Sequence, residues 1–198
     1  SVNDKIKKIK LDKLVSEMNF LETELKYQKT IAETAVPDFN LEVTKELERR
    51  GASRPPTQKA PPNRAQRRAA KKASKGTSKI FKQIAKKIHP DKLSKQGDPD
   101  EKDKKEKFLE ATEAKDEDNS LKLYSIALEL GLSSIELEKE DIEHFEGQIS
   151  KVKKDIVSLT TSWVYVWGTQ DSEEMKQSII KNFVDLMTET DDKQSNSE

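Results

Sequence analysis

The hydrophobic pattern at the start of the chain is that of a coiled-coil helix. Its apolar residues follow a 3-4-3-4 spacing and are Leu11, Leu14, Met18, Leu21 and Leu25. This spacing places them along one seam of a helix. Because proline lacks an N–H and its ring clashes with the preceding turn, we expect the helix to end at Pro37. A short second helix is expected over residues 41–50, so that residues 1–50 form an N-terminal coiled-coil segment.

A longer pattern of the same kind lies in the C-terminal part of the chain. Its positions alternate by three and four residues and are Ile135, Glu138, Ile142, Phe145, Ile149, Val152, Ile156, Leu159, Trp163 and Val166. The pattern predicts one amphipathic helix over residues 134–166, within a segment 132–168, although residues 162–167 are rich in β-forming types. Such a helix needs a second seam to cover it. The N-terminal seam can fold back onto it, and a homodimer through the C-terminal seam is the alternative.

A last helix is predicted over residues 169–187. Asp171 and Glu174 form a capping-box pattern at its start, and its apolar positions are Met175, Ile179, Phe183 and Leu186. The polar residues 188–198 are expected to form a disordered tail. The aromatic run over residues 163–167 is interpreted as part of a helical seam, with an exposed interaction patch as the alternative.

The middle of the chain contains a proline-rich stretch followed by a helical region. Residues 51–62 combine prolines with charges and cannot bury a face, which indicates an extended linker. Residues 63–131 are then predicted to form short helices. The first covers residues 63–73, and the last covers residues 121–130 before Gly131. That last helix is apolar on most sides, so we expect it to be buried against its neighbours.

Within this region, the helix that ends at Ile88 has two distinct faces. Its apolar face holds Phe81, Ile84, Ala85 and Ile88, and nearly opposite lie Lys75, Lys79, Lys82 and Lys86. Pro90 lacks an N–H and disfavours helical backbone at His89, so the helix must stop there. The tripeptide His89-Pro90-Asp91 therefore directly follows a helix with one apolar face and one basic face.

Composition favours an elongated all-α protein. Hydrophobic residues make up 32% of the chain and charged residues 37%, against the usual ~45–50% and ~25%, which leaves too little apolar material for one large core. The chain has no cysteine, which excludes disulfides, a thiol nucleophile and cysteine-ligated zinc. No apolar run approaches the ~20 residues that span a bilayer, and the start has no secretory apolar region. We therefore expect a cytoplasmic protein.

The net charge of zero conceals a strong asymmetry. Residues 51–95 carry fourteen basic side chains and one acidic, whereas residues 96–198 carry thirteen basic and twenty-six acidic. The basic stretch needs an anionic partner, which can be a nucleic acid, an acidic protein surface or the acidic half of this chain.

The helix and tripeptide resemble the second helix and loop of a J-domain, the module by which DnaJ-type co-chaperones engage the ATPase domain of DnaK-class heat-shock chaperones. The family has a basic helix that begins at an aromatic residue and ends in Ala-x-Lys-aromatic-His-Pro-Asp-Lys. The matching positions are Phe81, Ala85, Lys87, His89, Pro90, Asp91 and Lys92, while Ile88 replaces the usual aromatic residue. The family then has a loop, here expected over residues 93–99, and a third helix with a Phe near its middle, here Phe108.

Two features depart from the family pattern. The usual tyrosine one turn beyond the Phe is missing, and Lys115 takes its place. The usual first helix, with its Tyr-x-x-Leu-Gly motif, is also missing, and residues 63–73 stand there instead. The resemblance covers residues 78–130, about a quarter of the chain, and is strongest at the tripeptide.

The resemblance implies a co-chaperone that stimulates ATP hydrolysis by a DnaK-class partner and directs that partner to a client protein. The chain itself would be no enzyme and would hold no cofactor or metal. The docking residues would be Lys79, Lys82, Lys86, Lys87 and Lys92 together with His89, Pro90 and Asp91. They would bind an acidic surface of the ATPase domain, where Asp91 would engage a cationic switch group. A small J-region between coiled coils also resembles J-domain chaperones encoded by some large DNA phages, whose site of action would be the host cytoplasm.

Other interpretations stay open. The protein can be a coiled-coil scaffold with a vestigial J-type loop, or a basic nucleic-acid-binding protein. The second basic cluster holds Arg64, Arg67, Arg68, Lys71 and Lys72. It can be a solvated helix face, a second surface for the chaperone, or a phosphate-binding surface without base specificity. A catalytic role for His89 is weaker, because no nucleophile or phosphate-binding loop accompanies it, and His144 is interpreted as a surface residue.

Overall fold

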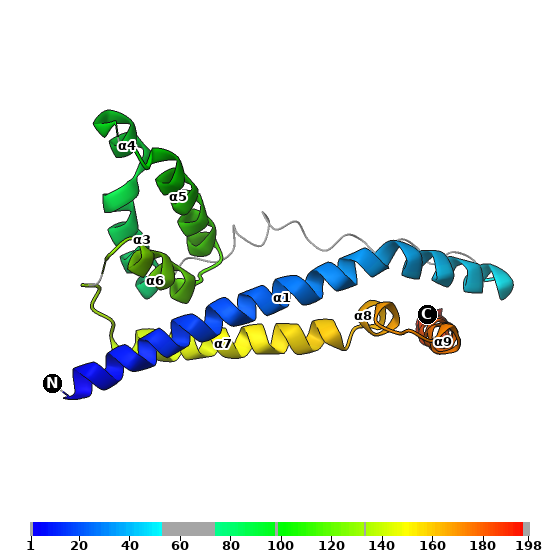
Figure 1. Ribbon diagram of the computed structural model, residues 1–198. Coiled ribbons are helices and arrows are strands. Elements are labelled where there is room, and N and C mark those ends of the chain that lie inside the picture. The colour runs from blue at the N-terminus through cyan, green and yellow to red at the C-terminus, as the bar shows by residue number, and fades with distance from the viewer. Residues whose placement is uncertain (1, 53–73, 98, 133, 196–198) are drawn as a thin grey trace. The chain divides into compact units, whose positions relative to one another are not determined.

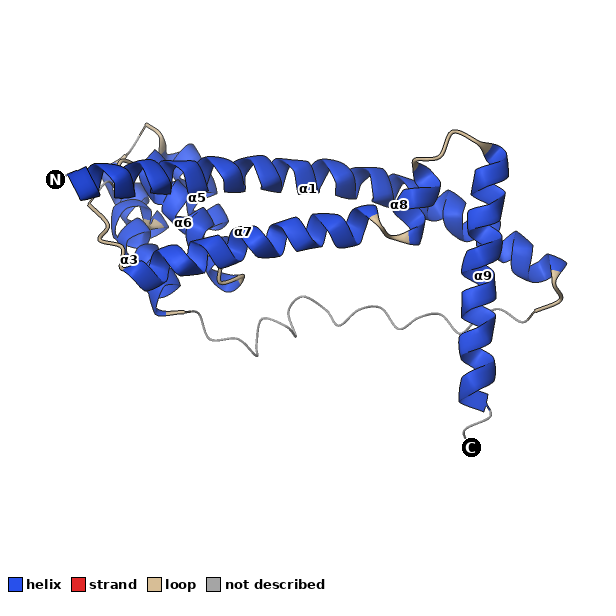
Figure 2. Cartoon of the chain, turned by 90° about the horizontal axis from the view of Figure 1, so that it is seen from below, coloured by secondary structure: helices blue, strands red, loops and turns tan. Residues whose placement is uncertain are grey.

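The computed structural model describes residues 2–52, 74–97, 99–132 and 134–195, and these residues form helices and short connections without a strand (Figures 1 and 2). The all-α prediction is therefore confirmed for them. The helices are α1 (Val2–Arg49), α3 (Lys75–Ile88), α4 (Pro90–Gln96), α5 (Glu101–Asp116), α6 (Ser120–Glu129), α7 (Lys139–Thr160), α8 (Trp163–Gly168) and α9 (Glu173–Ser195). In this part of the chain, no helix has both the length and the apolar character needed to cross a membrane.

The chain divides into two compact units. The first unit combines Ser1–Leu21 with Ala60–Lys151, and the second combines Glu22–Lys59 with Val152–Glu198. Two of the divisions, after Leu21 and after Lys151, fall inside α1 and α7, so each of these helices contributes residues to both units.

Helix α1 continues through Pro37, so the prediction that the proline ends it is wrong. The helix is 48 residues long and has Pro37 in its interior. An interior proline costs about 3 kcal/mol because a backbone hydrogen bond is lost. In the second unit, Phe39, Val43 and Leu47 lie on one face directly after the proline and are buried to 8% exposure or less. Burying side chains of this size stabilises by roughly 1.5–3 kcal/mol each, which outweighs the cost of the proline.

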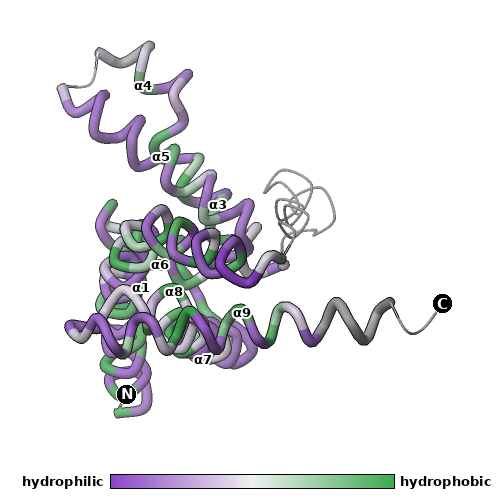
Figure 3. The backbone as a smooth tube through the Cα atoms, turned by 90° about the vertical axis from the view of Figure 1, so that its right-hand side faces the viewer, coloured by the Kyte–Doolittle hydropathy of each residue, from purple (hydrophilic) through white to green (hydrophobic). Residues whose placement is uncertain are grey.

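The first unit is built around the hairpin of α3 and α5, with α4 at its tip (Figure 1). The apolar face of α3 is centred on Ile80, Ile84 and Ile88, which are fully buried, whereas Phe81 is only half-buried. Opposite them α5 buries its two small residues, Ala111 and Ala114. The rest of α5 is charged, and Figure 3 accordingly colours most of this helix as hydrophilic.

Helix α6 fills the base of the first unit, as its apolar sequence predicts. Leu121, Leu123, Ile126 and Ala127 have no exposed surface, and the helix ends before Gly131, whose φ of 73° suits glycine. The ring of Tyr124 lies 5.7 Å from that of Phe145 of α7. Burial raises the pKa of Tyr124, and the charge of Asp12 on α1 raises it further, which places this tyrosine close to both long helices.

The N-terminal and C-terminal seams lie side by side in the first unit (Figures 1 and 2). Leu11, Leu14 and Met18 of α1 are buried, as are Phe145 and Ile149 of α7. At the surface, Lys10 Nζ lies 2.6 Å from Glu146 Oε1, which joins the two helices. The predicted fold-back of one seam onto the other is therefore present within a single chain for these residues.

The predicted helix over residues 134–166 is shorter than expected and is followed by a separate one. Helix α7 begins at Lys139 and ends at Thr160. The Ser162 hydroxyl then accepts a hydrogen bond from the N–H of Tyr165 and caps α8. A serine in this role ends the continuous helical hydrogen-bonding pattern and starts a new helix, which the 3-4 alternation alone does not reveal.

The second unit has an aromatic core where α8 and α9 meet the C-terminal part of α1. Its buried members are Phe39, Val43, Leu47, Trp167, Ile179, Ile180 and Val184. The ring of Phe39 contacts Trp167 and Phe183 edge-on, at centroid distances of 5.7 and 5.2 Å. Trp167 is thus a core residue, as the seam interpretation predicts, and Trp163 contacts Phe183 at 5.8 Å while staying 38% exposed.

Helix α9 differs from its prediction at both ends. The hydroxyl of Ser172 accepts the N–H of Met175 at 3.3 Å, so Ser172 caps the helix and the predicted Asp171–Glu174 box does not. The helix also continues to Ser195, through residues that were expected to be a disordered tail.

Candidate functional site

The tripeptide lies at the junction of two helices. The N–H of His89 donates to Ala85 O at 3.0 Å and closes the last turn of α3. The same residue has extended backbone, with φ −60° and ψ 133°, and acts as the N-cap of α4. Pro90 then occupies the first position of α4, where its missing N–H costs nothing. The predicted end of the basic helix at His89 is confirmed.

The loop expected over residues 93–99 is largely replaced by helix. Helix α4 runs from Pro90 to Gln96 and ends at Gly97, whose φ of 59° is left-handed. Lys92 and Leu93 donate their N–H groups to His89 O at 2.9 and 3.3 Å. Leu93, only 2% exposed, anchors the short helix to the hairpin. The tripeptide therefore begins α4, which is held by hydrogen bonds to His89 O and by the buried side chain of Leu93.

His89 and Asp91 have different surroundings. The side chain of Asp91 is 83% exposed, whereas that of His89 is 44% exposed. The His89 Nδ1 accepts the N–H of Asp91 at 3.3 Å and lies 3.7 Å from its Oδ2. The carboxylate is thus held beside the imidazole but points into solvent, where a partner can reach it.

Aromatic side chains lie beneath the imidazole. The ring of Phe108, on α5, meets the His89 ring edge-on at a centroid distance of 5.3 Å. Phe108 also contacts Phe81, on α3, at 5.9 Å. Lys115 completes this group, with its Nζ 4.6 Å from the centre of the Phe81 ring. The residue that departs from the J-domain pattern is therefore in contact with the aromatic residues that support the tripeptide.

The predicted lysines fall into two groups. Lys82 and Lys86 are exposed on α3. Lys79 instead donates to Glu136 O at 2.6 Å, and Lys87 donates to Leu130 O, so both bind the connection between α6 and α7. Lys92 donates to Lys86 O at 2.9 Å at the end of α3. A hydrogen bond to a carbonyl oxygen does not neutralise a lysine, so all five lysines keep their positive charge and contribute to a basic surface. Only Lys82 and Lys86 make none of these hydrogen bonds.

The second basic cluster lies outside the described residues. It comprises Arg64, Arg67, Arg68, Lys71 and Lys72. Most of the proline-rich linker lies there too. Whether this cluster belongs to the site stays a prediction.

A polar group at the other end of α3 was not predicted. The Asp118 carboxylate accepts the N–H of Ser74 at 2.9 Å and the hydroxyl of Thr77 at 2.5 Å. Burial alone would raise the pKa of Asp118, but these hydrogen bonds outweigh it and lower the pKa below its usual value. Gln148 of α7 donates to Asp118 O at 2.7 Å. In the sequence, Asp118-Asn119 is a turn-forming pair, but the groups that bind the Asp118 carboxylate come from a segment distant in sequence.

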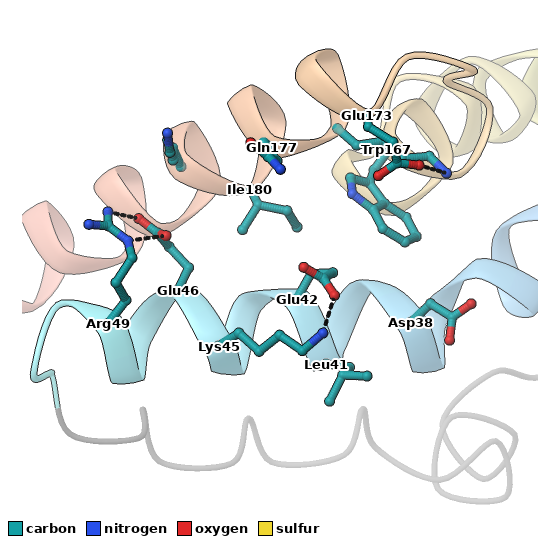
Figure 4. Close-up of a pocket in the computed structure, with 12 residues that line it drawn as sticks. Asp38, Leu41, Glu42, Lys45, Glu46, Arg49, Trp167, Glu173, Gln177 and Ile180 are labelled. Atoms are coloured by element: carbon teal, nitrogen blue, oxygen red, sulfur yellow. Dashed lines mark hydrogen bonds and ion pairs between the residues drawn. The ribbon is translucent and has the colours of Figure 1, made fainter.

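A groove in the second unit has a different character (Figure 4). It has a volume of about 650 Å³, and its lining includes acidic and basic side chains of α1 and α9 beside Trp167. Many of these charges pair with one another, as Lys45 does with Glu42 at 2.7 Å. The hydrogen bond from Arg49, with another from Arg50, lowers the pKa of Glu46 to about 2 despite burial. The groove is therefore largely self-neutralised and contains none of the predicted site residues.

No family model matches the chain, and neither does any curated protein or solved structure. The interpretation of the site therefore depends on its own residues and on the resemblance of their sequence pattern.

Proposed function

We propose that this chain is a J-domain co-chaperone. In this proposal, α3 and the tripeptide dock on the ATPase domain of a DnaK-class chaperone and stimulate its ATP hydrolysis. The chain binds no nucleotide for this purpose. It supplies a surface that favours the hydrolysis-competent state of the partner.

The observation that carries the proposal is the placement of the tripeptide. A basic helix ends at His89, its neighbour α5 places Phe108 against the imidazole, and the Asp91 carboxylate faces solvent at 83% exposure. A tripeptide that served only to end a helix would not need an exposed carboxylate beside a supported imidazole. This combination is suited to recognition of a cationic group.

The charge distribution supports the same conclusion. Lys82 and Lys86 are exposed one turn apart on α3, and Lys92 follows the tripeptide. Attraction between this surface and an acidic partner would accelerate association and make it sensitive to salt. Asp91 is the single negative charge among the residues 75–95. It would therefore give the docked complex its orientation.

Targeting of the partner to a client is the second half of the proposal. The coiled-coil arms and the second unit are the parts available for binding a client or a second copy of the chain.

The proposal is tested by single-turnover ATP hydrolysis on a DnaK-class chaperone, with and without the full chain. We expect wild type to accelerate hydrolysis and Asp91→Asn or His89→Gln to abolish the acceleration. Circular dichroism should be unchanged in both variants. Thermal unfolding should be unchanged in Asp91→Asn, because Asp91 is exposed and makes no core contact, whereas His89→Gln loses the ring contact with Phe108. Lys102→Gln, an exposed change on α5, is the control and should retain full stimulation.

Equal acceleration by wild type and both variants would overturn the assignment. Absence of acceleration by wild type, in the presence of several DnaK-class chaperones, would favour the scaffold interpretation. Salt-sensitive binding of DNA or RNA by the same basic residues would favour the nucleic-acid-binding one.

A further inference from the structure

A series of side-chain contacts leads from Lys115 to the tripeptide. The ammonium of Lys115 lies 4.6 Å from the centre of the Phe81 ring. Phe81 contacts Phe108 at 5.9 Å, and Phe108 contacts His89 at 5.3 Å. The contacts alternate between α5 and α3, so they also hold the two helices of the hairpin together.

Each of these side-chain contacts favours one geometry. A cation above an aromatic face is attracted by the negative charge of that face, and the attraction falls as the ring turns away. The ring of Phe108 meets His89 at an interplanar angle of 70°, an edge-on arrangement that aromatic pairs prefer. On its other side, His89 Nδ1 accepts the N–H of Asp91. The imidazole is therefore held between an aromatic ring and the backbone of the residue that faces solvent.

Lys115 is well placed for this role. It is half-buried, and its ammonium lies over the Phe81 ring. Within the described part of the chain, no carboxylate pairs with its ammonium, so the Phe81 ring is its main electrostatic contact. A salt bridge would have pulled the side chain elsewhere.

We propose that Lys115 is a positioning residue for the docking site, acting through Phe81 and Phe108 on the His89 imidazole. The cation holds Phe81, Phe81 limits the position of Phe108, and Phe108 fixes the imidazole next to Asp91. This proposal rests on the proposed function for its effect on the partner. Its structural half, the control of the His89 ring by Lys115, can be measured on this chain alone.

The test compares three variants of the full chain. Lys115→Met removes the charge and keeps the length of the stem, whereas Lys115→Arg restores a cation that can lie over the ring. Lys102→Met removes an exposed lysine from the same helix and is the matched control. The first readout is the ¹H and ¹⁵N shifts of the His89 imidazole and the ring protons of Phe108. The second is single-turnover stimulation of the partner's ATPase.

Lys115→Met is expected to shift the His89 and Phe108 signals and to reduce stimulation about two- to fivefold, the range of an exposed cation–π contact. Lys115→Arg should restore both, and Lys102→Met should change neither. Unchanged His89 signals in Lys115→Met would overturn the proposal. So would a shift of those signals that leaves stimulation by an active wild type intact. If wild type fails to stimulate, the proposed function fails, and the imidazole shifts alone decide whether Lys115 controls His89.

Discussion

The two ends of α3 differ in almost every physical respect. At its start, Thr77 is fully buried and donates to Asp118, and the Ser74 N–H donates to the same carboxylate. At its other end, the Asp91 carboxylate is 83% exposed. Both ends contain an aspartate close to a helix terminus, yet only one carboxylate has its hydrogen bonds satisfied within the chain.

This difference indicates a division of roles along one short helix. Buried polar groups need internal partners, because an unmet hydrogen bond there costs about 1–3 kcal/mol. An exposed carboxylate is satisfied by water and can exchange that water for a partner's cation. The start of α3 therefore fixes the helix in the first unit, and its end presents the tripeptide.

The largest expected effect comes from removing the Asp118 carboxylate at the start of α3. Asp118→Ala should lower the free energy of unfolding by about 2–3 kcal/mol, because the buried Thr77 hydroxyl loses its acceptor and alanine disfavours the positive φ of 54°. Urea unfolding followed by circular dichroism measures this. Asp118→Asn supplies an amide oxygen as acceptor and tolerates that φ, so it should lose less than half as much stability.

The same aspartate predicts a pH dependence. Its folded-state pKa is lowered, so its contribution to stability is present above the unfolded pKa of about 3.9 and is lost as the pH falls through the folded value. The stability difference between wild type and Asp118→Asn should therefore shrink below about pH 4. A difference that grows on acidification would contradict the hydrogen-bonded carboxylate. Asp91→Ala, at the exposed end, should change stability by about 0.5 kcal/mol or less at any of these pH values.

A smaller effect is expected from reversing two lysine charges near the end of α3 that carries the tripeptide. Lys82→Glu with Lys86→Glu should slow association with the ATPase domain about tenfold at low salt, and the difference should shrink as salt screens the charges. Stopped-flow association at several ionic strengths measures this. Lys75→Glu with Lys151→Glu makes the same change in net charge at exposed sites in the first turn of α3 and on α7. If that control slowed association equally, the effect would be one of net charge rather than of this surface.

The sequence was most informative where the constraint is local and covalent. Pro90 ends α3 at His89 because of its own ring, and Gly131 follows α6 with the positive φ that glycine accepts. It was least informative where distant segments decide. Pro37 does not end α1 because Phe39 and Val43 are buried beyond it, and the turn at Asp118 did not reveal that its carboxylate would receive Thr77 and Ser74.

The candidate site shows the same limit. The tripeptide and its basic helix could be named from the sequence, and so could Phe108. Their support by Phe81 and Lys115 depends on how α3 and α5 align, which spacing within either helix does not determine. The contacts of Lys79 and Lys87 with the connection after α6 are also tertiary, and they separate lysines that look equivalent in the sequence.

The central claim, that the exposed end of α3 is the docking surface, is tested most directly by following the backbone amide signals of the full chain during titration with a DnaK-class chaperone. The account predicts that signals from Lys82 to Lys92 broaden or shift first, while those of Thr77, Asp118 and the aromatic core around Trp167 move little. Asp91→Asn should abolish this response at the same chaperone concentration. Binding that perturbs the second unit and leaves residues 82–92 unchanged would contradict the account.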